Sequence, residues 1–250
     1  MVSGRFCPPR LCAVLTPFFL EETLLLALLA AFLAVDERAG WQSLLAHPVF
    51  SSILVGGLLG SMEAVLHVGI VLELVWLSIL PMRGMRRPDT VAGGVVGAAA
   101  TAIVLRHTGD PRELFIVAAG VLTGLVVAEI GGVVQRAFNR ARELRLGDFE
   151  FPESGPAATA RRLVWYQMFS VGSQALAAAL TVGVALPVAV ALTERLTEVA
   201  AGWMVTGSQW WIDLLPAFGA AALIRSYWHR DLNRFLVLSA GVVLVVLWIR

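Results

Sequence analysis

The segment HPVFSSILVGGLLGSMEAVLHVGIVLELVWLSILPMRGMRRPD, His47 to Asp89, decides the fold class of this chain. It is apolar enough to lie in a lipid bilayer, yet it contains Glu63, His67 and Glu73 among its glycines. A charged group at mid-membrane costs roughly 2.5–3.5 kcal/mol on insertion scales, because lipid offers no water to solvate it. We interpret Glu73 as part of a site for a polar solute or a proton. The alternative is an acid that only pairs with a polar group on a neighbouring helix.

The composition of the whole chain supports a membrane protein. Of its 250 residues, 58% are hydrophobic and only 15% are charged, whereas soluble domains carry about 25% charged residues. We predict an all-α, polytopic integral membrane protein with one transmembrane domain over residues 1–250. The net charge of +1 gives no reason to expect a nucleic-acid partner.

Several apolar runs are too short for plain spanning helices. The run at 49–60 is well below the ~20 residues that cross a bilayer and is rich in glycine. Such segments are typical of re-entrant or broken helices in transporters. Pro187 is expected to kink the long run that contains it. The predicted segments are 23–35, 49–60, 62–80, 90–105, 114–134, 165–192, 214–224 and 235–249.

Small residues dominate segment 90–105. Ala92, Gly93, Gly97 and Ala100 recur at helical spacing, and small residues let membrane helices approach closely. This face is expected to pack against a neighbouring helix, which belongs either to a second subunit or to the chain itself.

Orientation rests on the stretch from residue 136 to residue 162, which contains six arginines. Arginines close to membrane segments favour the cytoplasmic side, so we predict that this loop is cytoplasmic. Its first part, residues 135–146, is expected to extend the preceding helix. A second basic cluster consists of Arg83, Arg86 and Arg87. The side of the membrane on which it lies stays open, because the number of membrane crossings between it and the 136–162 loop is ambiguous. Most tryptophans, Trp165 among them, lie near segment ends, as in interfacial belts.

The chain shows no pattern of a metal, redox or phosphate-binding centre. Cys7 and Cys12 are the only cysteines, the histidines are scattered, and there is no lysine for a phosphate-binding loop. We expect no metal and no cofactor.

A set of residues between His47 and Asp89 resembles the signature of a transporter family. It resembles the membrane-spanning IIC component of the mannose/fructose/sorbose-type bacterial phosphotransferase system. The matching positions are His47-Pro48, Leu54-Val55-Gly56, Leu59-Gly60, Gly69, Leu72-Glu73-Leu74, Leu77 and Pro88-Asp89.

The resemblance implies a sugar-translocating subunit in the bacterial inner membrane that carries no phosphorylation site of its own and is not itself an enzyme. Its implied partners are the sugar, membrane lipid, a IID-like membrane subunit and soluble IIA/IIB-type phosphocarriers, in a hetero-oligomer. The candidate sugar-binding residues are Glu73, Ser61, His67, Trp76 and Asp89. Trp76 lies three residues after Glu73, on the same helical face, where its ring either stacks on a sugar or only packs.

The signature is eroded at several positions. His47 replaces the usual arginine, Ser61 replaces an acid, and the turn at 81–87 carries methionine and arginine instead of small residues. Two alternatives therefore stay open: a transport-inactive scaffold or regulator, and an unrelated carrier with Glu63, His67 and Glu73 as a proton relay.

Overall fold

A computed structural model of the chain describes residues 17–38, 44–77, 88–108, 113–146 and 156–200, together with 202, 204–208 and 210. Throughout these ranges the regular structure is helical, which confirms the predicted fold class. Cys7, Cys12, the cluster Arg83–Arg87 and the predicted segments 214–224 and 235–249 lie outside the described residues. The elements are α2 (Pro17–Arg38), η1 (Leu44–Ala46), α3 (Pro48–Leu59), α4 (Met62–Leu77), α5 (Thr90–Thr108), α6 (Glu113–Leu146) and α7 (Pro156–Val199).

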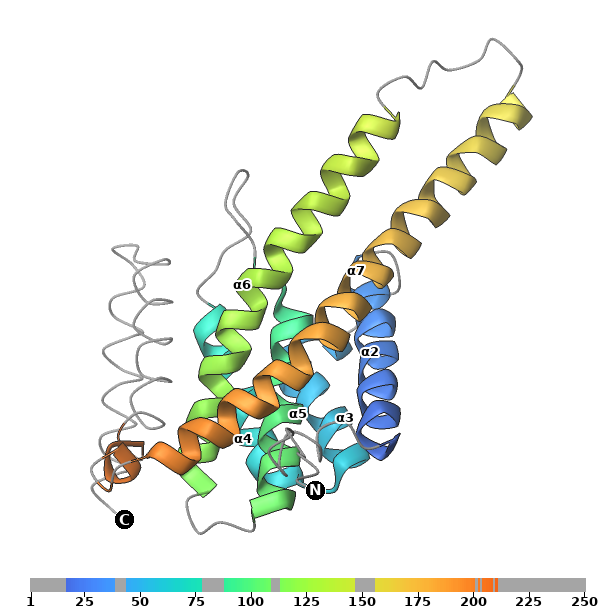
Figure 1. The fold of residues 1–250 in the computed structure, drawn as a ribbon. Helices are drawn as coiled ribbons and strands as arrows, with labels where there is room; N and C mark the ends of the chain where they lie inside the picture. Colours follow the sequence, from blue (N-terminus) through green and yellow to red (C-terminus); the bar gives the residue numbers. More distant parts are fainter. Residues whose placement is uncertain are drawn as a thin grey trace, which may run out of the picture.

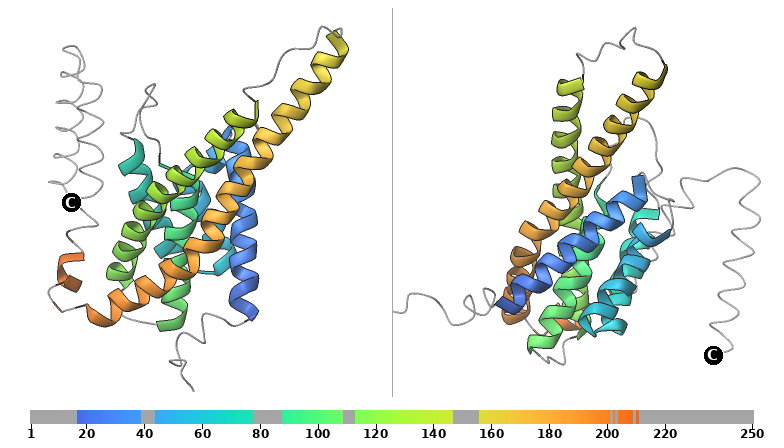
Figure 2. Two further views of the ribbon diagram at one scale, coloured as in Figure 1. Left: turned by 45° about the horizontal axis from the view of Figure 1, so that its top comes forward. Right: turned by 90° about the vertical axis from the view of Figure 1, so that its right-hand side faces the viewer.

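The helix α5 lies at the centre of the bundle, with α2, α3, α4, α6 and α7 packed around it (Figures 1 and 2). Every residue from Val91 to Val104 is buried. A helix made of Gly, Ala and Val is thin, so five neighbours approach it closely. The prediction that this segment serves packing is confirmed.

The closest approach is between α5 and α6. A Cβ atom on Gly93 would lie 2.6 Å from the carbonyl oxygen of Gly124, and one on Gly97 would lie 2.7 Å from that of Gly120. Both distances are too short for a side chain, so glycine is required at these crossings. The small-residue face of α5 therefore packs against α6 of the same chain, which is one of the two neighbours that the sequence allowed.

The helices α3 and α4 form a short hairpin. With 12 residues, α3 is about 18 Å long, well short of the hydrocarbon thickness of about 30 Å. Gly60 ends α3 in the left-handed conformation, at φ 79°, and α4 begins two residues later. A Cβ on Gly69 would lie 2.5 Å from Oγ of Ser52, so glycine also brings these two helices together.

The ends of α6 and α7 project well beyond the rest of the bundle (Figure 1). The structure confirms that the helix of the 114–134 segment continues through residues 135–146. Pro187 lies inside α7, which continues past it to Val199. Three described helices, α5, α6 and α7, are long and apolar enough to cross a membrane.

Ion pairs join the helices at the opposite end of the bundle. Arg106, in the last turn of α5, lies 2.8 Å from Glu22 of α2. The next residue, His107, contacts Glu194 of α7 with Nδ1 3.4 Å from Oε1. The helix α2 begins six residues before the predicted segment 23–35, so Glu22 lies within it and pairs with α5.

Candidate solute site

The carboxylate of Glu73 lies between two groups from the start of α3. Its Oε1 atom is 2.7 Å from Nδ1 of His47, and its Oε2 accepts a hydrogen bond from the backbone N–H of Val49 at 3.5 Å. His47 is the N-cap residue of α3 but makes no side-chain cap of its own. The Glu73 carboxylate therefore caps α3 from another helix, in the place where the helix dipole favours a negative charge.

A cavity of about 250 Å³ adjoins this pair. It lies where the C-terminal ends of α2 and α4 meet the N-terminal ends of α3 and α5. Carboxylate, imidazole and hydroxyl groups line it together with the face of an indole, so its walls offer both hydrogen-bonding partners and an apolar surface. Its lining residues are Glu37, Ala46, His47, Pro48, Glu73, Trp76 and Thr90.

Exposure differs between the polar residues of the cavity. The side chain of Glu73 is 21% exposed and that of His47 is 50% exposed, so a solute entering the cavity can reach both. Trp76 is 8% exposed and packs within a cluster of residues from α4 and α6. Trp76 is therefore part of the core and also lines the cavity, and its stacking on a sugar stays a prediction.

Asp89 lies beside the cavity, but its carboxylate is used within the fold. Oδ1 accepts a hydrogen bond from the backbone N–H of Ala92 at 3.0 Å, and Oδ2 accepts one from Nε2 of Gln135 at 2.6 Å. The residue is 1% exposed. This geometry is that of a helix N-cap, and it also ties the start of α5 to α6.

Ser61 and His67 lie away from the cavity. Ser61 occupies the turn between α3 and α4, where its carbonyl accepts the N–H of Val65. His67 is exposed on α4, with Nδ1 3.0 Å from the carbonyl oxygen of Glu63. Of the five residues predicted to bind sugar, the structure brings Glu73 and Trp76 together at the cavity. The alternative of a proton relay is not supported by these contacts. Glu73 pairs with His47, and His67 contacts the backbone carbonyl of Glu63, not its carboxylate.

Sequence analysis missed His47, Glu37 and Thr90 as members of this site. The position of His47 directly before Pro48 was a usable signal, because proline is favoured in the first turn of a helix and helix N-termini attract carboxylates. Glu37, in contrast, comes from a segment whose partner could not be read from local pattern.

One protein family matches over most of the chain. The family described as "PTS system sorbose-specific iic component" matches residues 20–247. The chain belongs to this family. The resemblance read from the His47–Asp89 segment is thereby confirmed, and the chain is a membrane subunit of a phosphotransferase system for sugar.

A solved structure supports the fold of this IIC-family chain. The protein, described as "Structure of membrane protein", matches with a TM-score of 0.65 and 17% sequence identity. The match covers 94% of this chain and 96% of that chain. No curated protein matches the sequence.

Proposed function

We propose that this IIC-family chain binds one sugar molecule at the Glu73 cavity and passes it through the bacterial inner membrane, while soluble partner subunits phosphorylate it. The observation that carries the proposal is the position of Glu73. Its carboxylate is held by His47 and by the N-terminus of α3, and it lines a small polar cavity.

The chemistry of the cavity suits a neutral sugar. A carboxylate accepts hydrogen bonds from sugar hydroxyls, and hydrogen bonds to an ionised group are about twice as strong as neutral ones. The volume is just below the roughly 300 Å³ at which small-molecule pockets begin, which favours a single sugar ring over a larger solute. Trp76 offers an apolar wall for the carbon face of the ring.

The position of the cavity suits transfer to a partner on the arginine-rich side. Asp89, which precedes cavity residue Thr90, bonds Gln135 of α6. Gln135 lies just before the projecting part of α6 that carries Arg136 and Arg140. The cavity therefore lies at the end of the bundle from which α6 and α7 project. If that end is cytoplasmic, as the arginines favour, a bound sugar is close to the compartment of the soluble phosphocarriers.

The test compares two glutamates of α4 that differ in position. Glu73→Gln removes the charge at the cavity, whereas Glu63→Gln makes the same chemical change at an exposed residue of the first turn. Uptake of labelled sorbose, fructose and mannose would be measured in cells that also make the co-encoded subunits, together with the amount of assembled protein.

We expect Glu73→Gln to lower uptake at least about tenfold at normal protein levels, as for loss of hydrogen bonds to a charged group, and Glu63→Gln to transport normally. Normal uptake by Glu73→Gln would show that the site is elsewhere. Loss of the assembled protein in the Glu73→Gln variant would show that Glu73 serves the stability of the fold through its pair with His47. A wild type that binds no sugar would favour a scaffold, and uptake without the soluble subunits would favour a proton-coupled carrier.

A further inference from the structure

A long groove between α6 and α7 is not used by the solute site. Its upper part, a cavity of about 600 Å³, lies between the projecting ends of the two helices, and its lower part, of about 390 Å³, lies between their membrane-spanning parts. The residues of α7 that line the two cavities recur every three or four positions from Trp165 to Leu192. Those of α6 do so from Thr123 to Arg142. Residues at this spacing share one face of a helix, so the two cavities form one groove.

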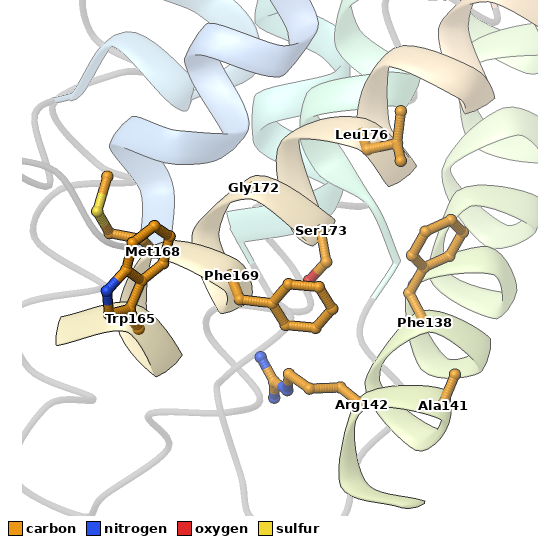
Figure 3. A pocket seen from close by; sticks show the side chains of 9 residues that line it. All are labelled: Phe138, Ala141, Arg142, Trp165, Met168, Phe169, Gly172, Ser173 and Leu176. Carbon is orange, nitrogen blue, oxygen red and sulfur yellow. The ribbon is translucent and has the colours of Figure 1, made fainter. Parts of the chain in front are cut away.

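The two parts of the groove differ in chemistry. The lower part is lined by Val, Ile, Leu and Ala side chains and two threonines. The upper part has aromatic and methionine walls and one cation, Arg142, whose guanidinium lies beside Phe169 (Figure 3). Nη1 of Arg142 donates a hydrogen bond to Oγ of Ser170. Its Nε is buried and, within the described part of the chain, has no hydrogen-bond partner.

The depth of Arg142 follows from the length of α6. Residues 114–134, apolar except for Thr123 and Glu129, form about 31 Å of helix, which matches a hydrocarbon core of about 30 Å. Arg142 comes eight residues later, about 12 Å along the helix, beyond the hydrocarbon and close to the lipid headgroups. Arg140 and Arg161 are exposed near this level, and Trp165 is 69% exposed, as interfacial tryptophans are.

We propose that this groove binds an anionic phospholipid, with the phosphate at Arg142 and an acyl chain along the lower groove. One lipid molecule supplies both an anion for the guanidinium and an apolar chain for the wall below it. A transmembrane helix in the same place would cover the apolar wall but would also need an acidic group at the level of Arg142. Basic pockets between membrane helices are known to select anionic headgroups.

Native mass spectrometry of the full-length chain, purified in mild detergent together with its membrane partner subunit, tests this proposal, with phosphatidylglycerol and phosphatidylcholine added separately. Arg142→Gln removes the cation of the groove, and Arg140→Gln is the matched control on the exposed face of the same helix. Gly172→Leu fills the upper groove; a Cβ at Gly172 meets nothing within 4 Å, so this variant is expected to fold.

We expect Arg142→Gln to weaken phosphatidylglycerol binding about tenfold, in line with loss of a charge-assisted contact, and Arg140→Gln to change it less than about twofold. Gly172→Leu should remove the bound lipid. Equal effects of the two arginine variants, or equal binding of both lipids by the wild type, would overturn the proposal. So would a photo-cross-linker at Met168 that captures a protein segment, from this chain or from another subunit, instead of lipid.

Discussion

Nδ1 of His47 lies 2.7 Å from Oε1 of Glu73, which joins the residue before α3 to the C-terminal part of α4. The pair closes the open end of the α3–α4 hairpin, while Gly60 forms the turn at its other end. It is an ion pair when the imidazole is protonated and a hydrogen bond to a carboxylate otherwise. The contact keeps the carboxylate at the cavity wall rather than in a free rotamer.

His47→Ala is expected to weaken sugar binding. Loss of a hydrogen bond to a charged group costs about 1.5–3 kcal/mol, so the apparent Kd or KM should rise by about tenfold or more. His47→Arg places N–H donors beside the Glu73 carboxylate again and should stay within about threefold of the wild type, a difference below 1 kcal/mol. The measurement is concentration-dependent uptake of the transported sugar. If alanine and arginine gave equal values, the role assigned to His47 would be refuted.

Gly97→Ala is expected to destabilise the protein, because the new Cβ would lie 2.7 Å from the carbonyl oxygen of Gly120. Overpacking of this kind costs about 1–3 kcal/mol. The matched control is Gly183→Ala on α7, where a Cβ meets nothing within 4 Å. Thermal unfolding in detergent should show a lower midpoint for the Gly97 variant and an unchanged or higher one for the control. Equal midpoints would mean that α5 and α6 are not as close as described.

Asp89→Ala should reduce stability more than it reduces sugar affinity. The substitution removes the N-cap of α5, worth about 0.5–2 kcal/mol, and leaves the buried amide of Gln135 without its partner. Asp89→Asn retains an oxygen that accepts the Ala92 N–H and should be milder. Unfolding midpoints and sugar binding by the folded fraction would both be measured. A loss of affinity as large as that of Glu73→Gln, at unchanged stability, would instead place Asp89 in the sugar site.

The 136–162 region is expected to face the cytoplasm, on the basis of its arginines. Single cysteines at Ser154 and Thr159, in a chain whose Cys7 and Cys12 are replaced by serine, should resist an impermeant thiol reagent applied to intact cells. The same cysteines should react after permeabilisation, which serves as the control. Prompt labelling from outside would invert the topology.

We expect the chain to work in a complex with a second membrane subunit. Short helices such as α3 leave backbone polar groups at their ends that must be kept away from lipid. Purification in mild detergent, with and without the co-encoded membrane subunit, would show the dependence. Aggregation alone and rescue by the partner are expected, whereas a monodisperse sugar-binding monomer would contradict this prediction.

The sequence by itself determined the membrane class, the family and the apolar central parts of the described helices, because hydrophobicity and glycine content are local properties. The helices α2 and α7 begin six and nine residues before the predicted segments. The short run before Gly60 predicted α3, and the basic stretch after Val134 predicted the extension of α6. The acid Glu73 also stood out from its apolar neighbours in the sequence.

Only the tertiary structure decided what these residues contact. His47 and Glu73 are 26 residues apart, and their pairing depends on the way the α3–α4 hairpin closes against Gly69. Gly93 and Gly97 of α5 could serve an internal or an external neighbour, and the bundle assigned them to α6. Asp89 caps α5 through a local bond from Ala92, but its second bond, from Gln135 far along the chain, depends on the packing of α6. Such long-range contacts arise from the packing of whole helices, which no local pattern encodes.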